Sequence, residues 1–137
     1  MFCTIYIKKK MIKEGLSYIS STVVTDEKCA ASMGSGNLMV FATPAMIALA
    51  ENAAMMAVAD SLPAGSTTVG GGIDMLHLRP SGVGATIEAT ATVTSVEGRK
   101  ISYELKVCDA NGVIGEGTHV RFVVDIEKFM QKIAAKG

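Results

Sequence analysis

Glu51 has the surroundings that most suggest chemistry, because it lies inside FATPAMIALAENAAMMAVADSL (41–62), where nearly every other residue is apolar. Its neighbours on one helical face would be Ile47, Ala48, Ala54 and Met55. Since all four are apolar, an ordinary exposed glutamate is a poor explanation, and burying an unpaired carboxylate costs several kcal/mol. Two explanations stay open: a structural carboxylate paired across a dimer seam, and a catalytic carboxylate that desolvation tunes for general-base work.

His77 and Thr43 are the other two side chains that could take part in a reaction. His77 stands in IDMLHLRP, where alternation gives it a face shared with Ile73, Met75 and Arg79. A single strand histidine is commonly a core or rim residue, but an imidazole paired with a carboxylate is a usual device of base catalysis. Thr43 directly precedes Pro44 and suits the N-cap of a helix. Its hydroxyl could also orient water or act as a nucleophile.

Three consecutive glycines, Gly70 to Gly72, could expose backbone N–H groups to a developing oxyanion, with Gly70 and Gly71 as the candidate donors. A bulge that bends the strand explains them equally well. The spacing is not GxGxxG at a strand–helix junction, so no dinucleotide site is expected. The basic side chains that could meet a phosphate are Arg79, Arg99, Lys100 and Arg121, although each also fits an ordinary surface charge.

The composition of the 137-residue chain fits one domain with a single core. Thirteen basic and thirteen acidic residues cancel, so the chain lacks the electrostatic footprint of a nucleic-acid-binding protein. Hydrophobic residues make up 49% and the mean hydropathy is +0.36, which for so short a chain favours burial against a second copy, as a homodimer or larger homo-oligomer. No apolar run reaches the ~18 residues needed to span a membrane.

The cysteines and the N-terminus indicate a cytoplasmic protein. Cys3, Cys29 and Cys108 form no CxxC, which argues against a disulfide framework or a structural zinc, and with only two histidines no metal site is expected. In MFCTIYIKKKMIKEG the charges follow the apolar stretch, unlike a secretory signal. We expect residues 1–14 to be an N-terminal tail, with 1–10 a tail or a misplaced start, and 15–137 to form one domain.

One long helix and several strands are expected around these residues. A strand is predicted over 16–25, a flexible loop of small residues over 32–37, and a helix from Thr43 to about residues 60–62. The later elements are predicted as strands over 66–80, 85–96, 99–109 and 113–125 and a short helix over 126–136. Asn111-Gly112 predicts a type I′ hairpin turn.

Two of these strands alternate clearly enough to assign their buried faces. The predicted inward residues are Ile87, Ala89, Ala91 and Val93 on one strand, and Ile101, Tyr103, Leu105 and Val107 on the next. A helix that is apolar all round must be enclosed, and a four-strand antiparallel meander curved around it would do so. The fold class is therefore α+β, an antiparallel sheet wrapped around one long central helix, the arrangement called a hotdog fold.

The sequence resembles the fluoroacetyl-CoA thioesterase-like branch of the hotdog acyl-CoA thioesterases. The similarity extends from about Val23 to Phe129 and includes VFATPAMIALAENAA, TTVGGGIDMLHLRPSGVGA, VEGRKISYEL and GEGTHVRF. The resemblance implies a catalytic set of Thr43, Glu51 and His77, with Gly70 assisting at the substrate carbonyl. It implies hydrolysis of a small or medium acyl-CoA thioester to the acid and CoA, without metal or redox cofactor, in a homodimer whose active sites lie at the interface. It does not carry over the fluorinated substrate, because SMGSGNLM lacks the aromatic lid.

Helix geometry adds one constraint to this resemblance. Thr43 and Glu51 are eight residues apart, ~12 Å along an ideal helix, so they cannot touch within one regular helix. We therefore expect either that the groups acting on one thioester come from both subunits or that the helix begins after Pro44. A hotdog hydratase is a weaker alternative, because the expected aspartate–histidine pair is missing. A non-catalytic acyl-CoA binder or sensor stays open.

Overall fold

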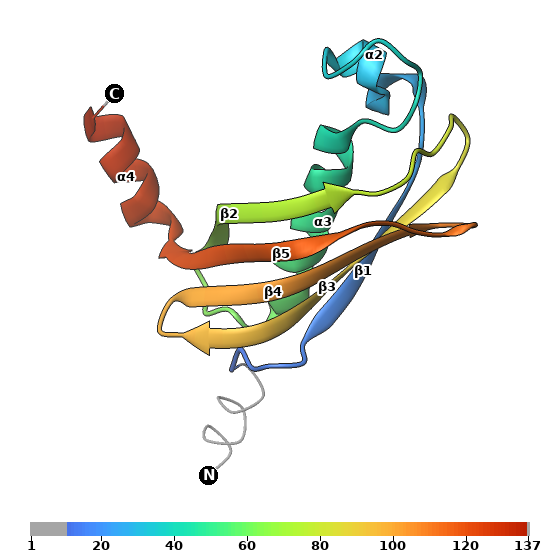
Figure 1. The fold of residues 1–137 in the computed structure, drawn as a ribbon. Helices are drawn as coiled ribbons and strands as arrows, with labels where there is room; N and C mark the ends of the chain where they lie inside the picture. Colours follow the sequence, from blue (N-terminus) through green and yellow to red (C-terminus); the bar gives the residue numbers. More distant parts are fainter. Residues whose placement is uncertain (1–10, 137) are drawn as a thin grey trace.

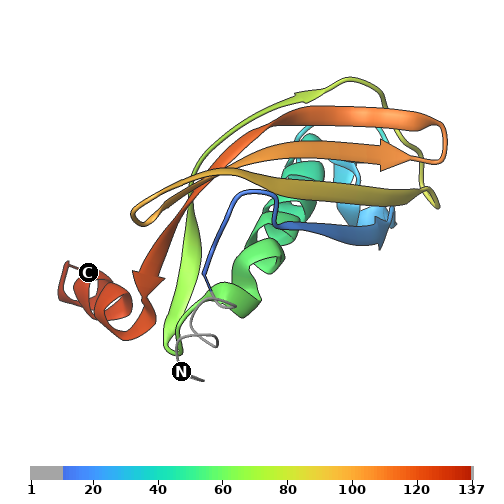
Figure 2. The ribbon, with the colours of Figure 1, turned by 90° about the horizontal axis from the view of Figure 1, so that it is seen from below.

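The computed structural model describes residues 11–136, and its elements follow the predicted order (Figure 1). The strands are β1 (Ser17–Val23), β2 (Ser66–His77), β3 (Thr86–Glu97), β4 (Lys100–Asp109) and β5 (Gly112–Asp125). The helices are η1 (Asp26–Lys28), α2 (Ala30–Met33), α3 (Thr43–Val58), η2 (Ala59–Ser61) and α4 (Ile126–Lys136). Figure 2 shows the sheet arching over α3, as the hotdog prediction required.

The sheet has the strand order β1-β3-β4-β5-β2, with every neighbouring pair antiparallel. β3, β4 and β5 form the predicted meander, but β2 pairs with β5 and not with β3, so the prediction of a four-strand meander was wrong. Alternation within a strand sets which side chains point inward but not which strand lies alongside. As a result β2 is an edge strand, and its outer edge is unpaired within the described chain.

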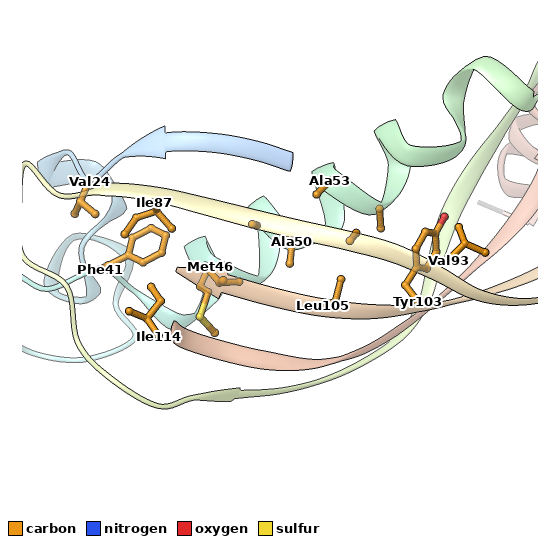
Figure 3. Packing of buried hydrophobic residues seen from close by; sticks show 14 of the residues in the cluster. Val24, Phe41, Met46, Ala50, Ala53, Ile87, Val93, Tyr103, Leu105 and Ile114 are labelled. Atoms are coloured by element: carbon orange, nitrogen blue, oxygen red, sulfur yellow. The ribbon is translucent and has the colours of Figure 1, made fainter. Parts of the chain in front are cut away.

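The core lies between α3 and the concave face of the sheet. The predicted inward residues of β3 and β4 are all buried, and they meet Met46, Ala50 and Ala53 of α3. Figure 3 shows Phe41, Ile87 and Ile114 together at one end of this layer and Tyr103 beside Val93 at the other. Alanines on the buried face let α3 approach the strands closely, while each large side chain contributes about 1.5–3 kcal/mol by leaving water.

The bulge in β2 and the turn between β4 and β5 were both predicted from glycines in the sequence. The β2–β5 register shifts between Gly70 and Gly72, which confirms the predicted bulge. A Cβ at Gly71 would collide with the Phe122 ring, so a side chain is excluded there by the neighbouring strand. The turn at Asn111-Gly112 is present, but only Gly112 has a positive φ (126°), so the type I′ prediction was wrong.

The chain ends and loops depart from the predictions in smaller ways. The loop predicted over 32–37 is partly helical, because α2 extends to Met33. Ile12, which we placed in the N-terminal tail, packs against the core, while the doubtful first ten residues lie outside the described part of the chain. Cys29 and Cys108 are free thiols. Between residues 11 and 136, no helix is long and apolar enough to cross a membrane.

Candidate active site

Thr43 is the first residue of α3 and not its N-cap. The N-cap is Ala42, whose backbone is extended and which makes no side-chain capping bond, so the capping prediction for Thr43 was wrong. Backbone bonds tie the preceding segment in place, from Phe41 N–H to Ser81 O (2.8 Å) and from Ala42 N–H to Lys28 O (2.9 Å). The Thr43 hydroxyl is therefore free for another partner, and it lies 2.8 Å from His77 Nδ1.

His77, at the end of β2, is held in a setting that keeps its imidazole neutral. Burial lowers the pKa of His77 below the ordinary 6.5, opposed by a backbone hydrogen bond at Arg79. The Phe41 ring meets the imidazole edge-on, with centroids 6.5 Å apart. Nε2 is buried and has no hydrogen-bond partner among the described residues. A cavity of about 310 Å³ opens beside this pair, between α2, the start of α3 and the end of β2.

Glu51 lies two turns further along α3 and does not reach this pair. The helix is continuous from Thr43 to Val58, which excludes the expected alternative of a later helix start. Within the described chain Glu51 makes no hydrogen bond to Thr43 or His77. Its Oε2 instead lies beside the bulge, 3.1 Å from the position that a Cβ on Gly70 would occupy. One protomer thus brings together two of the three expected catalytic residues.

Two residues that the sequence analysis did not assign to catalysis, His119 and Arg121, also lie at Gly70. The same Cβ position is 3.6 Å from His119 Cε1 and 3.7 Å from Arg121 Nη1. His119 is 2% exposed and Arg121 7% exposed. A signal was available, because both alternate onto the inward face of THVRF, where charged or titratable residues are seldom buried.

A hydrogen-bond network holds the Arg121 guanidinium. Arg121 donates to Thr68 Oγ1 (2.8 Å) and Thr68 O (2.9 Å), and its Nη1 lies 3.3 Å from His119 Nε2. His119 Nδ1 lies 2.6 Å from Gly72 O, so the Nδ1–H tautomer donates there and accepts from Arg121. The pKa of His119 and the pKa of Arg121 are both lowered, chiefly by burial, and the negative charge of Glu51 opposes part of this lowering. Burial also raises the pKa of Tyr103, stacked on His119, to about 12.

The three arginines considered for phosphate binding have different surroundings. The Arg121 side chain is buried and its guanidinium is bound to Thr68, so the prediction that it contacts a phosphate was wrong. Arg79 is 45% exposed and forms an ion pair with Asp109 at 3.4 Å. The pKa of Asp109 is lowered, and the hydrogen bond from the Ser81 hydroxyl is the largest cause. Arg99 is exposed at the turn between β3 and β4.

The two glycines predicted to donate to an oxyanion, Gly70 and Gly71, lie on the exposed bulge of β2.

Metal ligation finds no support in this arrangement. The part of the chain that the structure describes contains no group of three or more His, Cys, Asp or Glu side chains that could hold an ion. These residues are suited to acid–base chemistry. The Thr43 hydroxyl lies against the neutral His77 ring, and the Glu51 carboxylate lies beside the exposed backbone at Gly70. This is the equipment for adding a water or hydroxyl oxygen to a polarised carbonyl.

Sequence comparison identifies the relatives of this chain. A family model described as fluoroacetyl-CoA-specific thioesterase matches residues 24–127. The fluoroacetyl-CoA thioesterase of Streptantibioticus cattleyicolor is 39% identical over 97 residues, which cover 71% of this chain and 70% of that protein.

Structural comparison agrees with the sequence. A structure of fluoroacetyl-CoA thioesterase superimposes with a TM-score of 0.86 at 32% identity, covering 92% of this chain and 98% of the other. A thioesterase superfamily member from Thermus thermophilus has a TM-score of 0.84 at 23% identity, covering 90% and 92%, and supports the hotdog fold alone.

Proposed function

This chain belongs to the fluoroacetyl-CoA-specific thioesterase family and is an acyl-CoA thioester hydrolase, and we propose that each active site is built from two protomers of a homodimer. Thr43 and His77 come from one protomer and Glu51 from its partner. The observation that carries this proposal is the unbroken α3, which keeps Glu51 away from the Thr43–His77 pair of its own chain. A carboxylate from the partner subunit would complete that pair as a base.

The free edge of β2 supports a two-fold dimer that could supply this carboxylate. Two copies of an edge strand pair antiparallel about a two-fold axis, which also removes the unpaired edge. Because Glu51 lies beside Gly70, a register that sets Gly70 opposite His77 of the partner subunit brings the two groups together. The bulge at Gly70–Gly72 favours close approach there, since no side chains project.

The reaction follows from these positions. His77 accepts a proton from water, or from the Thr43 hydroxyl, as the oxygen adds to the thioester carbonyl, and Glu51 of the partner subunit stabilises the imidazolium. Backbone N–H groups at Gly70, Gly71 or the start of α3 stabilise the oxyanion. The C–S bond then breaks, and the imidazolium returns its proton to the CoA thiolate. Attack by Thr43 adds an acyl-enzyme that water opens by the same steps.

The substrate and setting complete the proposal. A small or medium acyl-CoA fits, without metal or redox cofactor, because the groups described provide the base and the polarising donors themselves. The segment before α3 carries Met33, Ser35 and Asn37 and no aromatic residue before Phe41, so we do not assign a fluorinated substrate. Free Cys29 and Cys108 support a reducing compartment such as the cytoplasm.

Thiol release from a panel of acyl-CoAs tests the assignment. Glu51→Gln keeps the shape of the side chain and removes its charge, so kcat should fall on the order of 10²- to 10⁴-fold while the unfolding midpoint changes little. Glu88→Gln, an exposed glutamate on β3, is the matched control and should retain activity. Normal turnover by the Glu51 variant would remove the carboxylate from the mechanism. Binding of acyl-CoA with no thiol release by the wild type would favour a sensor.

A further inference from the structure

A second cavity, of about 380 Å³, lies at the opposite end of β2 from the candidate active site. It is formed where α4 leaves the sheet next to the first residue of β2 and the turn between β3 and β4 (Figure 1). Its lining includes Ser66, Arg99, Asp125, Lys128, Phe129 and Lys132. The family match ends at residue 127, so most of the α4 contribution lies beyond it.

The charge of this cavity stands out in a chain with no net charge. Arg99, Lys128 and Lys132 supply three positive charges, and the only ion pair among the described residues is Arg79–Asp109, elsewhere in the molecule. The one acid in the lining, Asp125, accepts the Lys128 backbone N–H at its Oδ1 (3.0 Å) and offsets one of these charges. Three cations against one carboxylate leave the cavity lining with two net positive charges.

The shape and the remaining lining select the kind of anion. Lys128 and Lys132 are one helical turn apart on α4, and both line the cavity together with Arg99 from the turn between β3 and β4. Ser66 adds a hydroxyl, and the half-buried Phe129 adds an aromatic face. Phosphate groups are recognised by clustered Arg and Lys, and a purine stacks on an aromatic ring. Phosphates plus a flat base describe a nucleotide.

We propose that this cavity binds the phosphorylated adenosine end of the acyl-CoA substrate whose thioester is held by the partner subunit's active site. The inference rests on the proposed dimer. In that arrangement Gly70 lies opposite His77 of the partner subunit, and the antiparallel register carries Ser66 four residues, ~13 Å, past it. The pantetheine arm of CoA spans the interval between nucleotide and thioester.

The distance within one chain supports the assignment across the interface. Ser66 and His77 of the same protomer are separated by the whole of β2, ~35 Å of extended strand. Figure 1 shows α4 at one end of the sheet and α2, which borders the Thr43–His77 cavity, at the other. Each protomer thus offers a nucleotide site at one end and a reaction site at the other.

Charge reversal with two substrates tests the inference apart from the thioesterase assignment. The variant is the double substitution K128E/K132E, and the matched control is K13E/K106E, which makes the same charge change at two exposed lysines that do not line the cavity. The substrates are acetyl-CoA and the N-acetylcysteamine thioester of acetate, which has the same thioester but no nucleotide. The ratio of kcat/KM for the two should fall roughly tenfold or more in K128E/K132E, through KM, and stay at the wild-type value in the control. An unaltered ratio in K128E/K132E would overturn the inference while leaving the hydrolase intact.

A binding measurement tests the same nucleotide site without measuring turnover. Adenosine 3′,5′-bisphosphate should bind the wild type and K13E/K106E in a calorimeter, with an affinity that weakens as salt rises, and should bind K128E/K132E at least tenfold more weakly. Equal binding by all three proteins, or by none, would refute the site. So would a requirement for Lys128 and Lys132 with acyl-carrier-protein thioesters while the bisphosphate fails to bind, since the charges would then serve an acidic protein.

Discussion

The two halves of the candidate active site differ in how complete they are within one protomer. At the start of α3, the Thr43 hydroxyl and His77 Nδ1 are paired beside an open cavity, but Nε2 is left without a partner among the described residues. In the middle of α3, Glu51 lies beside Gly70 with two buried cationic or titratable groups, His119 and Arg121, close by. The first half lacks a carboxylate, and the second has one beside Gly70 of the edge strand β2.

The difference shows that an unbroken helix can separate residues that act together. Eight residues of α3 hold Thr43 and Glu51 ~12 Å apart, so no side-chain rotation within one chain joins them. In the proposed dimer, two-fold symmetry would remove this difficulty, because it would place the second half of one protomer against the first half of the other. The predictions below disturb each half in turn.

Among changes that leave Thr43, Glu51 and His77 themselves in place, the largest effect is expected from a methyl group at Gly70. A Cβ there would lie 3.1 Å from Glu51 Oε2 and would displace the carboxylate, so Gly70→Ala should lower kcat on the order of 10- to 100-fold. Gly82→Ala is the matched control, because a Cβ at Gly82 meets nothing within 4 Å and the residue lies outside β2. Thiol-release assays on both variants, with unfolding midpoints to confirm folding, compare them. Equal activities would show that the position of Glu51 is not critical.

The network under Glu51 should matter chiefly for stability. Thr68→Val removes the hydroxyl that accepts the Arg121 Nε–H and leaves a buried charged donor unsatisfied, so the free energy of unfolding should drop by about 1–3 kcal/mol. Thr68→Ser keeps an acceptor and should recover most of this loss. Denaturant unfolding with both variants measures it, and a Val variant as stable as the wild type would mean that water or another group replaces the hydroxyl.

The smallest expected effect is the pH dependence of the half that contains His77. Burial lowers the pKa of His77 below 6.5, and only the neutral ring can accept a proton. In Glu51→Gln, which removes the negative charge that the proposed dimer sets beside the ring, the acid limb of the residual kcat/KM should therefore lie below pH 6.5 and below that of the wild type. Histidine NMR titration identifies the group responsible. An acid limb at the same pH in both proteins would mean that Glu51 does not act on His77.

The sequence contained most of the fold because its patterns are local. The alternation of Ile87 to Val93 and of Ile101 to Val107 predicted two buried faces correctly, and the glycine run predicted the bulge in β2. The partner of β2 could not be read, because strand pairing depends on the path of the chain between residues 77 and 86. The type I′ turn failed for a similar reason, since a register shift after Val107 lets the chain reverse with a positive φ at Gly112 alone.

The candidate site was predicted by residue but not by arrangement. Thr43 was expected to cap α3, yet backbone bonds at Phe41 and Ala42 start the helix one residue earlier and release the hydroxyl to His77. Arg121 was considered a surface contact, although its alternation with His119 pointed inward. The Thr43 error concerns tertiary contacts, which composition and spacing do not encode, whereas the Arg121 error overlooked an alternation that the sequence contains.

Subunit complementation tests the central claim most directly. His77→Ala and Glu51→Gln should each be inactive alone, and mixed after reversible dissociation they should form dimers in which one of the two sites has Thr43, His77 and the partner subunit's Glu51 all intact. With random re-association, thiol release should return to about a quarter of the wild-type rate. No recovery, in mixtures shown to contain the mixed dimer, would place all three groups in one chain and contradict the account.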